Sequence, residues 1–263
     1  MLNKYLMFTK SQMQINTAYS AWYWAGTISS IMRLMIMFYF WHAVYDGKDT
    51  IQNLTLQDML TYIVVAMFIQ GYVSGAGNEL AHEIRDGNIA IELMRPYDVI
   101  FKLIFMDFGG KITHFLRETI PLMVIAFIFI QITWPGSAEA ALLFVISAGF
   151  GIWIGTFFDL MIGIVAFWTV NVWGLRVLKD GVITFFSGAL VPITLFPGWL
   201  ESISAYLPFQ AMVFTPVSIY TGIVEGSDAY VAVLIQFGWC LGMFVIMKLI
   251  WAQAIKKVTI FGG

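Results

Sequence analysis

Long apolar runs separated by short polar stretches dominate the pattern of this chain. A helix needs about 20 mainly apolar residues to cross the hydrocarbon core of a bilayer. Six segments reach or approach this length, and helices satisfy their own backbone polar groups in lipid. The pattern therefore predicts an all-α integral membrane protein with six transmembrane helices. The predicted spans are residues 22–44, 58–75, 117–134, 140–170, 177–195 and 229–251.

The positions of the basic residues predict how the spans are oriented. Lys and Arg are enriched in the cytoplasmic loops of membrane proteins. If the N-terminus is cytoplasmic, eleven basic residues fall on the cytoplasmic side and only Lys48 falls outside. We therefore predict a multi-pass protein of the cell inner (plasma) membrane with both termini in the cytoplasm. A five-span alternative, in which residues 177–195 do not cross, places the C-terminal lysine pair outside. The eleven residues are Lys4, Lys10, Arg85, Arg95, Lys102, Lys111, Arg117, Arg176, Lys179, Lys256 and Lys257.

Three segments outside the spans have patterns of their own. Residues 1–20 mix apolar with polar side chains, which predicts an interfacial helix rather than a cleaved signal peptide. Residues 98–115 form a second amphipathic run, expected to lie along the inner interface before the third span. Residues 192–225 are rich in proline and aromatic residues, which predicts an outer re-entrant segment of short helices. Its marker residues are Pro197, Trp199, Pro208, Phe209 and Pro216.

Composition supports lipid as the main solvent of this chain. Hydrophobic residues make up 60% of it and charged residues 11%, whereas soluble domains carry about 25% charged residues. The net charge of −2 argues against nucleic-acid binding, which requires a basic surface. Cys240 is the single cysteine, so disulfide frameworks and cysteine-based metal sites are excluded.

Three short stretches resemble fragments of catalytic motifs and are incomplete. Residues 107–109 spell Asp-Phe-Gly without the other kinase motifs. Residues 110–111 lack the flanking Gly and Ser/Thr of a P-loop, and residues 82–83 lack the second His of a zinc protease. We therefore predict no catalytic, cofactor-binding or metal site in this chain.

Small residues recur at helical spacing, which predicts close contacts between helices in lipid. The pairs are Gly71/Gly75, Gly151/Gly155 and Gly238/Gly242.

Two charged residues, Arg33 and Asp159, lie deep within predicted spans. A charge near the bilayer centre costs a few kcal/mol or more, so each side chain must face protein or water. They could pair with each other or with a second subunit. Two interpretations remain open for both residues: a polar feature of a translocation path, or a buried ion pair at an interface.

The segment 76–96 carries an unusual density of charge for so apolar a chain. Residues 76–86 predict a short helix with Leu80 and Ile84 on one face and carboxylates on another. Gly87 can end this helix in a left-handed cap, and Pro96 restricts the residue before it and closes the segment. By the charge distribution the segment is cytoplasmic.

This order of elements resembles the permease subunits of ABC-2 type (type V-like) exporters. The shared order is an interfacial helix, two spans, a cytoplasmic coupling helix, three spans, an outer re-entrant segment and a last span. Local sequence stretches are also similar to one branch of this family, the uncharacterised or daunorubicin-type export permeases, which was formerly listed as a domain of unknown function. The stretches that carry the resemblance are EIRDGNIAIELMRPYD (83–98), AFWTVNVWGL (166–175), SGALVPITLFPGWL (187–200), LPFQAMVFTPVSIYTG (207–222) and KKVTIFGG (256–263).

The resemblance implies that residues 1–263 form a single transmembrane permease domain that is not catalytic alone. Its coupling helix would dock into a separate ABC ATPase, present in two copies, which binds ATP and Mg. A second permease subunit would complete the translocation path of the exporter; a heterodimer is expected first and a homodimer second. The coupling residues implied are Glu79, Glu83, Arg85, Asp86, Gly87, Arg95 and Pro96.

Other interpretations compete with this one. The segment 76–96 could be a solvated inner loop. A self-contained secondary transporter or channel would need internal repeats and paired ionisable groups at mid-membrane, for which Arg33 and Asp159 are the candidates. A lipid-modifying membrane enzyme would need a catalytic cluster near one interface. The aromatic-rich interior does not identify a cargo.

Overall fold

The computed structural model describes residues 2–18, 20–169 and 172–257. Residues 170–171 and 258–263, which belong to two of the stretches that carry the family resemblance, lie outside the described residues. The described α-helices are α1 (Leu2–Ala18), α2 (Ser20–Val44), α3 (Leu56–Gln70), α4 (Ala76–Arg85), α5 (Ile89–Leu93), α6 (Val99–His114), α7 (Ile120–Ile125), α8 (Ala138–Ile164), α9 (Trp173–Phe186), α10 (Gly198–Ala205), α11 (Phe214–Thr221) and α12 (Gly226–Ala254).

Four stretches of the described chain are long and apolar enough to cross a membrane: Trp24–Val44, Val99–Ile130, Ala138–Phe167 and Gly226–Lys257. They overlap most of the first, third and fourth predicted spans and contain the sixth. The second and fifth predicted spans correspond to α3, of 15 residues, and α9, of 14 residues. Both helices are shorter than the roughly 20 residues that a straight crossing needs. The membrane-helical class is confirmed, and the count of six spans stays a prediction.

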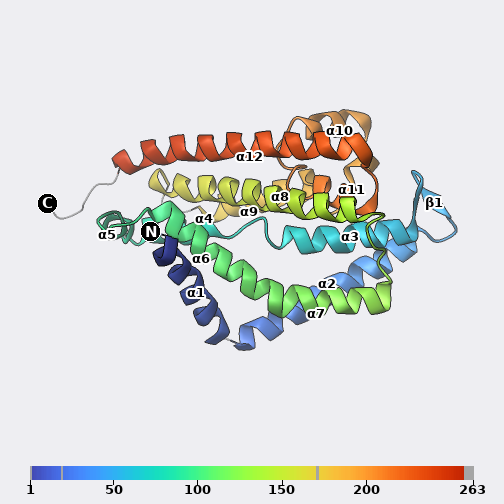
Figure 1. Cartoon of the computed structure of the whole chain (residues 1–263), viewed down its shortest axis with the longest axis horizontal. Helices are drawn as coiled ribbons and strands as arrows, with labels where there is room; N and C mark the ends of the chain where they lie inside the picture. Colours follow the sequence, from blue (N-terminus) through green and yellow to red (C-terminus); the bar gives the residue numbers. More distant parts are fainter. Residues whose placement is uncertain (1, 19, 170–171, 258–263) are drawn as a thin grey trace.

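The expected break between the amphipathic run at 98–115 and the span at 117–134 is absent, and the interfacial position of the run stays a prediction. Residues Val99–Ile130 form one helical stretch, which bends between α6 and α7 (Figure 1). Its central turn, η1 (Phe115–Thr119), is π-helical. Pro121 follows in the next turn and has no N–H to donate. A π turn is a common way for a helix to absorb such a local disruption.

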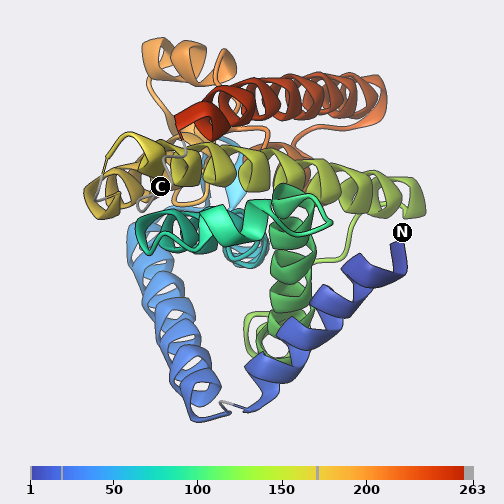
Figure 2. The ribbon, with the colours of Figure 1, turned by 90° about the vertical axis from the view of Figure 1, so that its left-hand side faces the viewer.

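Different elements lie at the two ends of the molecule. The beginning of α1, the end of α12 and the helices α4 and α5 lie at one end, and α10, α11 and the hairpin lie at the other (Figure 1). Figure 2 looks onto the first end, where α4 and α5 lie in front, between α8 and the helices α2 and α6. The hairpin pairs β1 (Thr50–Ile51) with β2 (Leu54–Thr55) and had no counterpart in the sequence pattern.

The N-terminal helix α1 is docked on α6 over its length. The Thr9 hydroxyl donates to the Phe105 carbonyl at 2.8 Å, and Lys4 Nζ donates to the Pro96 carbonyl at 2.7 Å. A side chain at Gly109 would overlap the Thr9 backbone, so the glycine permits this close crossing. The helix predicted within residues 1–20 is therefore present, with polar contacts to α6 and to the residue Pro96 before it.

The proline-rich segment 192–225 contains short helices, as the sequence pattern predicts. It comprises η4 (Ile193–Leu195), α10 and α11. Pro208 and Pro216 are buried and Phe209 is half-buried, whereas Pro197 and Trp199 are exposed. The Ala211 carbonyl accepts a hydrogen bond from the buried Gln236 side chain of α12 at 2.7 Å, so this irregular backbone is satisfied within the protein. The depth of the segment in a membrane stays a prediction.

Glycines on α8 allow the backbone of other segments to approach closely. A Cβ at Gly151 would overlap the Met212 carbonyl, and one at Gly155 would overlap the Val73 carbonyl. The predicted pair Gly151/Gly155 is therefore a packing face. The pair Gly238/Gly242 on α12 has open space at both positions within this chain.

We expect Gly155→Ala to destabilise the protein by about 1–3 kcal/mol, because the added methyl must displace backbone atoms. The matched control is Gly149→Ala on the same helix, where a Cβ meets no atom within 4 Å. That change should leave stability equal or raise it by up to about 1 kcal/mol through helix propensity. Thermal unfolding of both variants in detergent measures the difference, and equal midpoints would contradict the packing role of this face.

Candidate functional site

The charged segment 76–96 forms a compact unit of two short helices at one end of the molecule (Figure 2). In α4, Leu80 is fully buried and Ile84 is half-buried. The carboxylates of Glu79 and Asp86 are exposed, and that of Glu83 is half-buried. Burial raises the pKa of the Glu83 carboxyl above its ordinary value. The amphipathic face predicted for residues 76–86 is therefore present.

Gly87 ends α4 in the left-handed conformation, with φ of 77°. No atom lies within 4 Å of a Cβ placed there, so the backbone conformation alone accounts for the glycine. Arg85 pairs with Asp86 at 3.2 Å on the exposed side of this turn. These three predicted coupling residues thus form one solvent-facing turn.

The start of α4 is held against α8 by close backbone approach. A Cβ on Gly77 would overlap the Asp159 backbone, and a Cβ on Gly163 would overlap the Gly77 carbonyl. A Cβ on Gly75 would overlap the Asp107 carboxylate of α6. The segment can lie this deep between α6 and α8 because these positions have no side chain.

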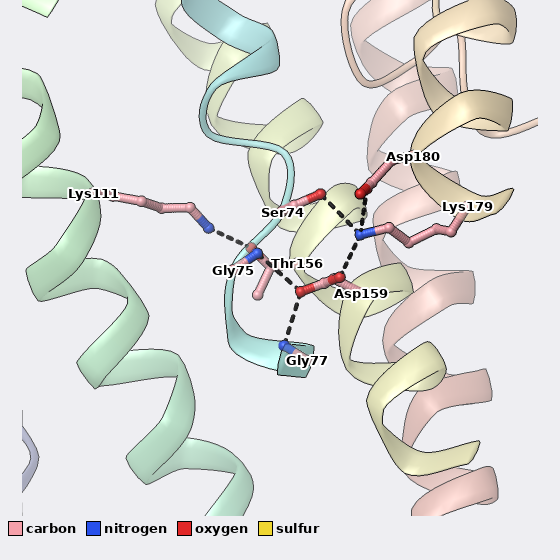
Figure 3. A network of polar contacts seen from close by, with 8 residues as sticks. All are labelled: Ser74, Gly75, Gly77, Lys111, Thr156, Asp159, Lys179 and Asp180. Carbon is pink, nitrogen blue, oxygen red and sulfur yellow. Dashed lines mark hydrogen bonds and ion pairs between the residues drawn. The ribbon is translucent and has the colours of Figure 1, made fainter. Parts of the chain in front are cut away.

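A buried carboxylate, that of Asp159 on α8, fixes this contact (Figure 3). Its Oδ2 accepts the backbone N–H groups of Gly75 at 2.9 Å and Gly77 at 2.8 Å. Its Oδ1 lies 2.6 Å from Lys179 Nζ of α9, and the two side chains are only 4% and 3% exposed. The negative charge is therefore balanced by one cation and by two backbone donors at the beginning of a helix.

Lys179 connects the carboxylate to two further groups (Figure 3). Its ammonium donates to Ser74 Oγ at 3.0 Å and pairs with Asp180 at 2.9 Å. Lys179 was counted among the charges of the cytoplasmic side, which stays a prediction; its side chain is buried in the protein and not exposed to solvent. A buried lysine needs such partners because an unpaired ammonium in the interior is costly.

A second polar link crosses from α6 to α8 beside the first. Lys111 pairs with Asp107 on the same helix and donates to Thr156 Oγ1 on α8 at 2.9 Å. Figure 3 shows this bond next to Gly75 and Asp159. The beginning of α4 is therefore bordered by fixed charges on both sides.

The second helix of the unit, α5, is anchored on α6 by the buried Glu92. Its carboxylate lies 2.7 Å from Lys102 Nζ, accepts the Tyr97 hydroxyl at 2.7 Å and pairs with Arg95 at 3.3 Å. Burial acts to raise the pKa of Glu92, and the hydrogen bonds and charges of these neighbours outweigh it, so the pKa is lowered. The predicted coupling residues Arg95 and Pro96 are both exposed. Arg95 also pairs with the buried Glu92.

The outer surface of the unit also exposes apolar side chains. Met94 is 84% exposed and Ile91 is 57% exposed, next to the exposed charges of Arg85, Asp86 and Arg95. Neither residue was among the predicted coupling residues. The sequence signal that could have identified them is the three-residue spacing of Ile91 and Met94, which places both on one face of a helical turn.

Arg33 does not pair with Asp159 in this structure. Its guanidinium donates to the Gln70 side-chain oxygen of α3 at 2.8 Å, whereas Asp159 pairs with Lys179. The alternative of a buried ion pair therefore applies to Asp159, with a different partner. Arg33 instead borders a cavity between α2, α3, η1 and α9.

A family model described as "ABC-2 family transporter protein" matches residues 31–262. The match includes α4, α5, Asp159, Lys179 and the proline-rich segment. Among curated proteins, no match was found.

We expect Lys179→Met to destabilise the protein by about 3–5 kcal/mol, because the Asp159 carboxylate loses its cation while buried. Asp159→Asn should cost less, because Lys179 keeps Asp180 and the Asn oxygen can still accept a backbone N–H. The double variant should cost less than the sum of the two.

Denaturant or thermal unfolding in detergent measures these differences. Lys256→Gln, a change at an exposed lysine, is the control and should stay within about 0.5 kcal/mol of the wild type. A cost for Lys179→Met as small as that of the control would contradict the role given to the buried pair.

Proposed function

Because this chain belongs to the ABC-2 family of transporters, we propose that it is the membrane-spanning permease subunit of an ATP-driven exporter. A multi-pass membrane protein of this family is a transport component and not itself a catalyst. In the proposal, the energy of ATP hydrolysis is supplied by a separate ABC ATPase with its own ATP and Mg. The unit of α4 and α5 receives the movement of that ATPase.

The observation that carries the proposal is the α4–α5 unit. It is exposed at one end of the molecule, combines the charges of Glu79, Arg85 and Asp86 with exposed Met94 and Ile91, and is fixed to three longer helices. Exposed apolar side chains within a polar rim are typical of a surface that binds another protein. A flexible solvated loop would need neither the buried Glu92 nor the Asp159 carboxylate.

The anchoring of the unit supports a mechanical role. Asp159 ties the beginning of α4 to α8, and Lys179 extends that tie to α9. Glu92 ties α5 to α6 through Lys102. A partner that displaces α4 and α5 would therefore move these helices as a connected body rather than bend a loop. We propose this as the route by which ATP binding and hydrolysis change access to the translocation path.

The same network argues against a self-contained secondary transporter. In such carriers, ionisable groups at mid-membrane bind the coupling ion or substrate. The Asp159 oxygens are occupied by two backbone N–H groups and Lys179. Releasing them would break the contact that positions α4.

We further propose that two copies of the ATPase and a second permease, first a related chain and next a copy of this one, complete the exporter. The cytoplasmic side in this proposal is the end that carries α4 and α5. The open glycine face of Gly238/Gly242 on α12 suits a close helix contact with another membrane chain.

Purification of the complex tests this assembly. The tagged chain is isolated from its native host in mild detergent, and its partners are identified by mass spectrometry. A stoichiometric P-loop ATPase, with or without a second multi-pass permease, would establish the class. Recovery of the chain alone, with no ATPase even after cross-linking, would overturn the proposal and favour a secondary transporter or channel.

We expect Met94→Asp to weaken retention of the ATPase by at least about tenfold, because a charge replaces an apolar contact at the centre of the docking surface. The side chain is 84% exposed in this chain, so folding should be unchanged. Tyr206→Asp at the opposite end is the matched control, since Tyr206 is 83% exposed. Titrated pull-down with ATPase activity as a second readout distinguishes them, and equal retention in both variants would contradict docking at this unit.

A further inference from the structure

A polar cavity of about 290 Å³ lies beside the span formed by α2. It is bordered by α2, α3, η1 and α9, and Ser74 and Asp180, which bind Lys179, are also part of its lining. Its polar lining includes Ser30, Arg33, Gln70, Glu118, Asp180 and Thr184. Ligand sites commonly combine such a volume with a few convergent polar groups.

The charged side chains around the cavity differ in whether they pair with a group of opposite charge. Glu118 pairs with His114 at 3.1 Å and accepts the Ser30 hydroxyl. Asp180 pairs with Lys179. In the described part of the chain, Arg33 has the neutral Gln70 amide as its hydrogen-bond acceptor and makes no ion pair. A guanidinium has five N–H donors, so Arg33 retains donors that can bind an anionic group.

A second, apolar groove of about 370 Å³ lies along α2. Its lining includes Ile31, Met35 and Phe38 of α2 and Ile125 and Phe129 on the facing helix. Leu34 lines both the cavity and the groove. Because Ile31 and Tyr39 lie eight residues apart on one helix, the apolar part extends for about 12 Å.

The cavity that contains Arg33 and the apolar groove are neighbours, because Leu34 lines both. We propose that the two together bind an amphiphile whose headgroup carries a phosphate or carboxylate. Arg33 would pair with that anionic group, and the hydrocarbon chain would lie between α2 and residues 125–130. An anionic partner also offsets the cost of holding a guanidinium within a membrane span.

The amphiphile can be the exported cargo or a phospholipid of the surrounding membrane, since both present the same chemistry. The cargo assignment rests on the proposed exporter function. Binding of a membrane phospholipid does not, so a failure of the exporter proposal and a failure of this site give different results.

The test uses a photoactivatable phosphatidic acid with a diazirine in its acyl chain. The matched probe is the corresponding diacylglycerol, which has the same chains and no phosphate. The purified complex in detergent is cross-linked with each probe, and labelled peptides are mapped by mass spectrometry. We expect labelling at Met35, Phe38 or Phe129 by phosphatidic acid, at least about tenfold stronger than by diacylglycerol, because one charge-assisted contact distinguishes the two.

Variants of Arg33 separate recognition from folding. Arg33→Gln should lower labelling by phosphatidic acid about tenfold to the diacylglycerol level, and Arg33→Lys should retain part of it. Lys48→Gln, outside the spans, removes a charge elsewhere and should change nothing. Labelling that does not depend on the phosphate or on Arg33, or that falls outside the groove, overturns the proposal.

ATPase activity then distinguishes the two sources of the amphiphile. If the amphiphile is cargo, phosphatidic acid should stimulate the ATPase of the wild-type complex and not that of Arg33→Gln. If it is a bound membrane lipid, labelling depends on Arg33 without such stimulation. If no ATPase is recovered and Arg33-dependent labelling persists in the isolated chain, the exporter proposal fails and the amphiphile site stands.

Discussion

The burial of the Asp159 carboxylate is the constraint on which the rest of this structure depends. A carboxylate in the interior requires both charge balance and hydrogen bonds. Lys179 supplies the charge and the N–H groups of Gly75 and Gly77 supply the bonds. Satisfying this one side chain therefore fixes three segments relative to one another: α8, which carries it, α9, and the start of α4. The position of the exposed α4–α5 unit follows from an ionic contact inside the protein.

Close backbone packing is the second requirement, and it explains the glycines at this place. The two N–H groups can reach Asp159 only if α4 begins almost in contact with α8, and a Cβ at Gly77 or Gly163 would prevent that approach. In lipid, helices associate through such close contacts and through hydrogen bonds rather than through exclusion of water. The glycines and the buried charge therefore act together, because neither one alone would hold α4 against α8.

Features of the structure that depend on neighbouring residues in the sequence were predictable, and features that depend on contacts between separate helices were not. The helix at 76–85 and the left-handed Gly87 follow from neighbouring residues, and both were predicted. The partner of Asp159 is Lys179, which lies on another helix 20 residues away. From the sequence alone, a lysine near the end of a predicted span is interpreted as an interfacial charge. The continuous helix Val99–Ile130 was missed for a related reason. Two pairs of its polar side chains contact each other within the helix, Asp107 with Lys111 and His114 with Glu118. Polar residues that suggested an interface are therefore compatible with a continuous helix.

The contacts described here also connect the α4–α5 unit to the Arg33 cavity. Ser74 and Asp180 border that cavity, and both bind the same Lys179 ammonium that holds Asp159. A displacement of α4 that alters the Asp159–Lys179 contact therefore changes groups that form the cavity wall. Coupling between distant sites requires a physical connection of this kind, with alternative arrangements that each site can favour. Lys179 is the one side chain in this network that contacts both sides, so movement at the surface and occupancy of the cavity act on the same ion pair.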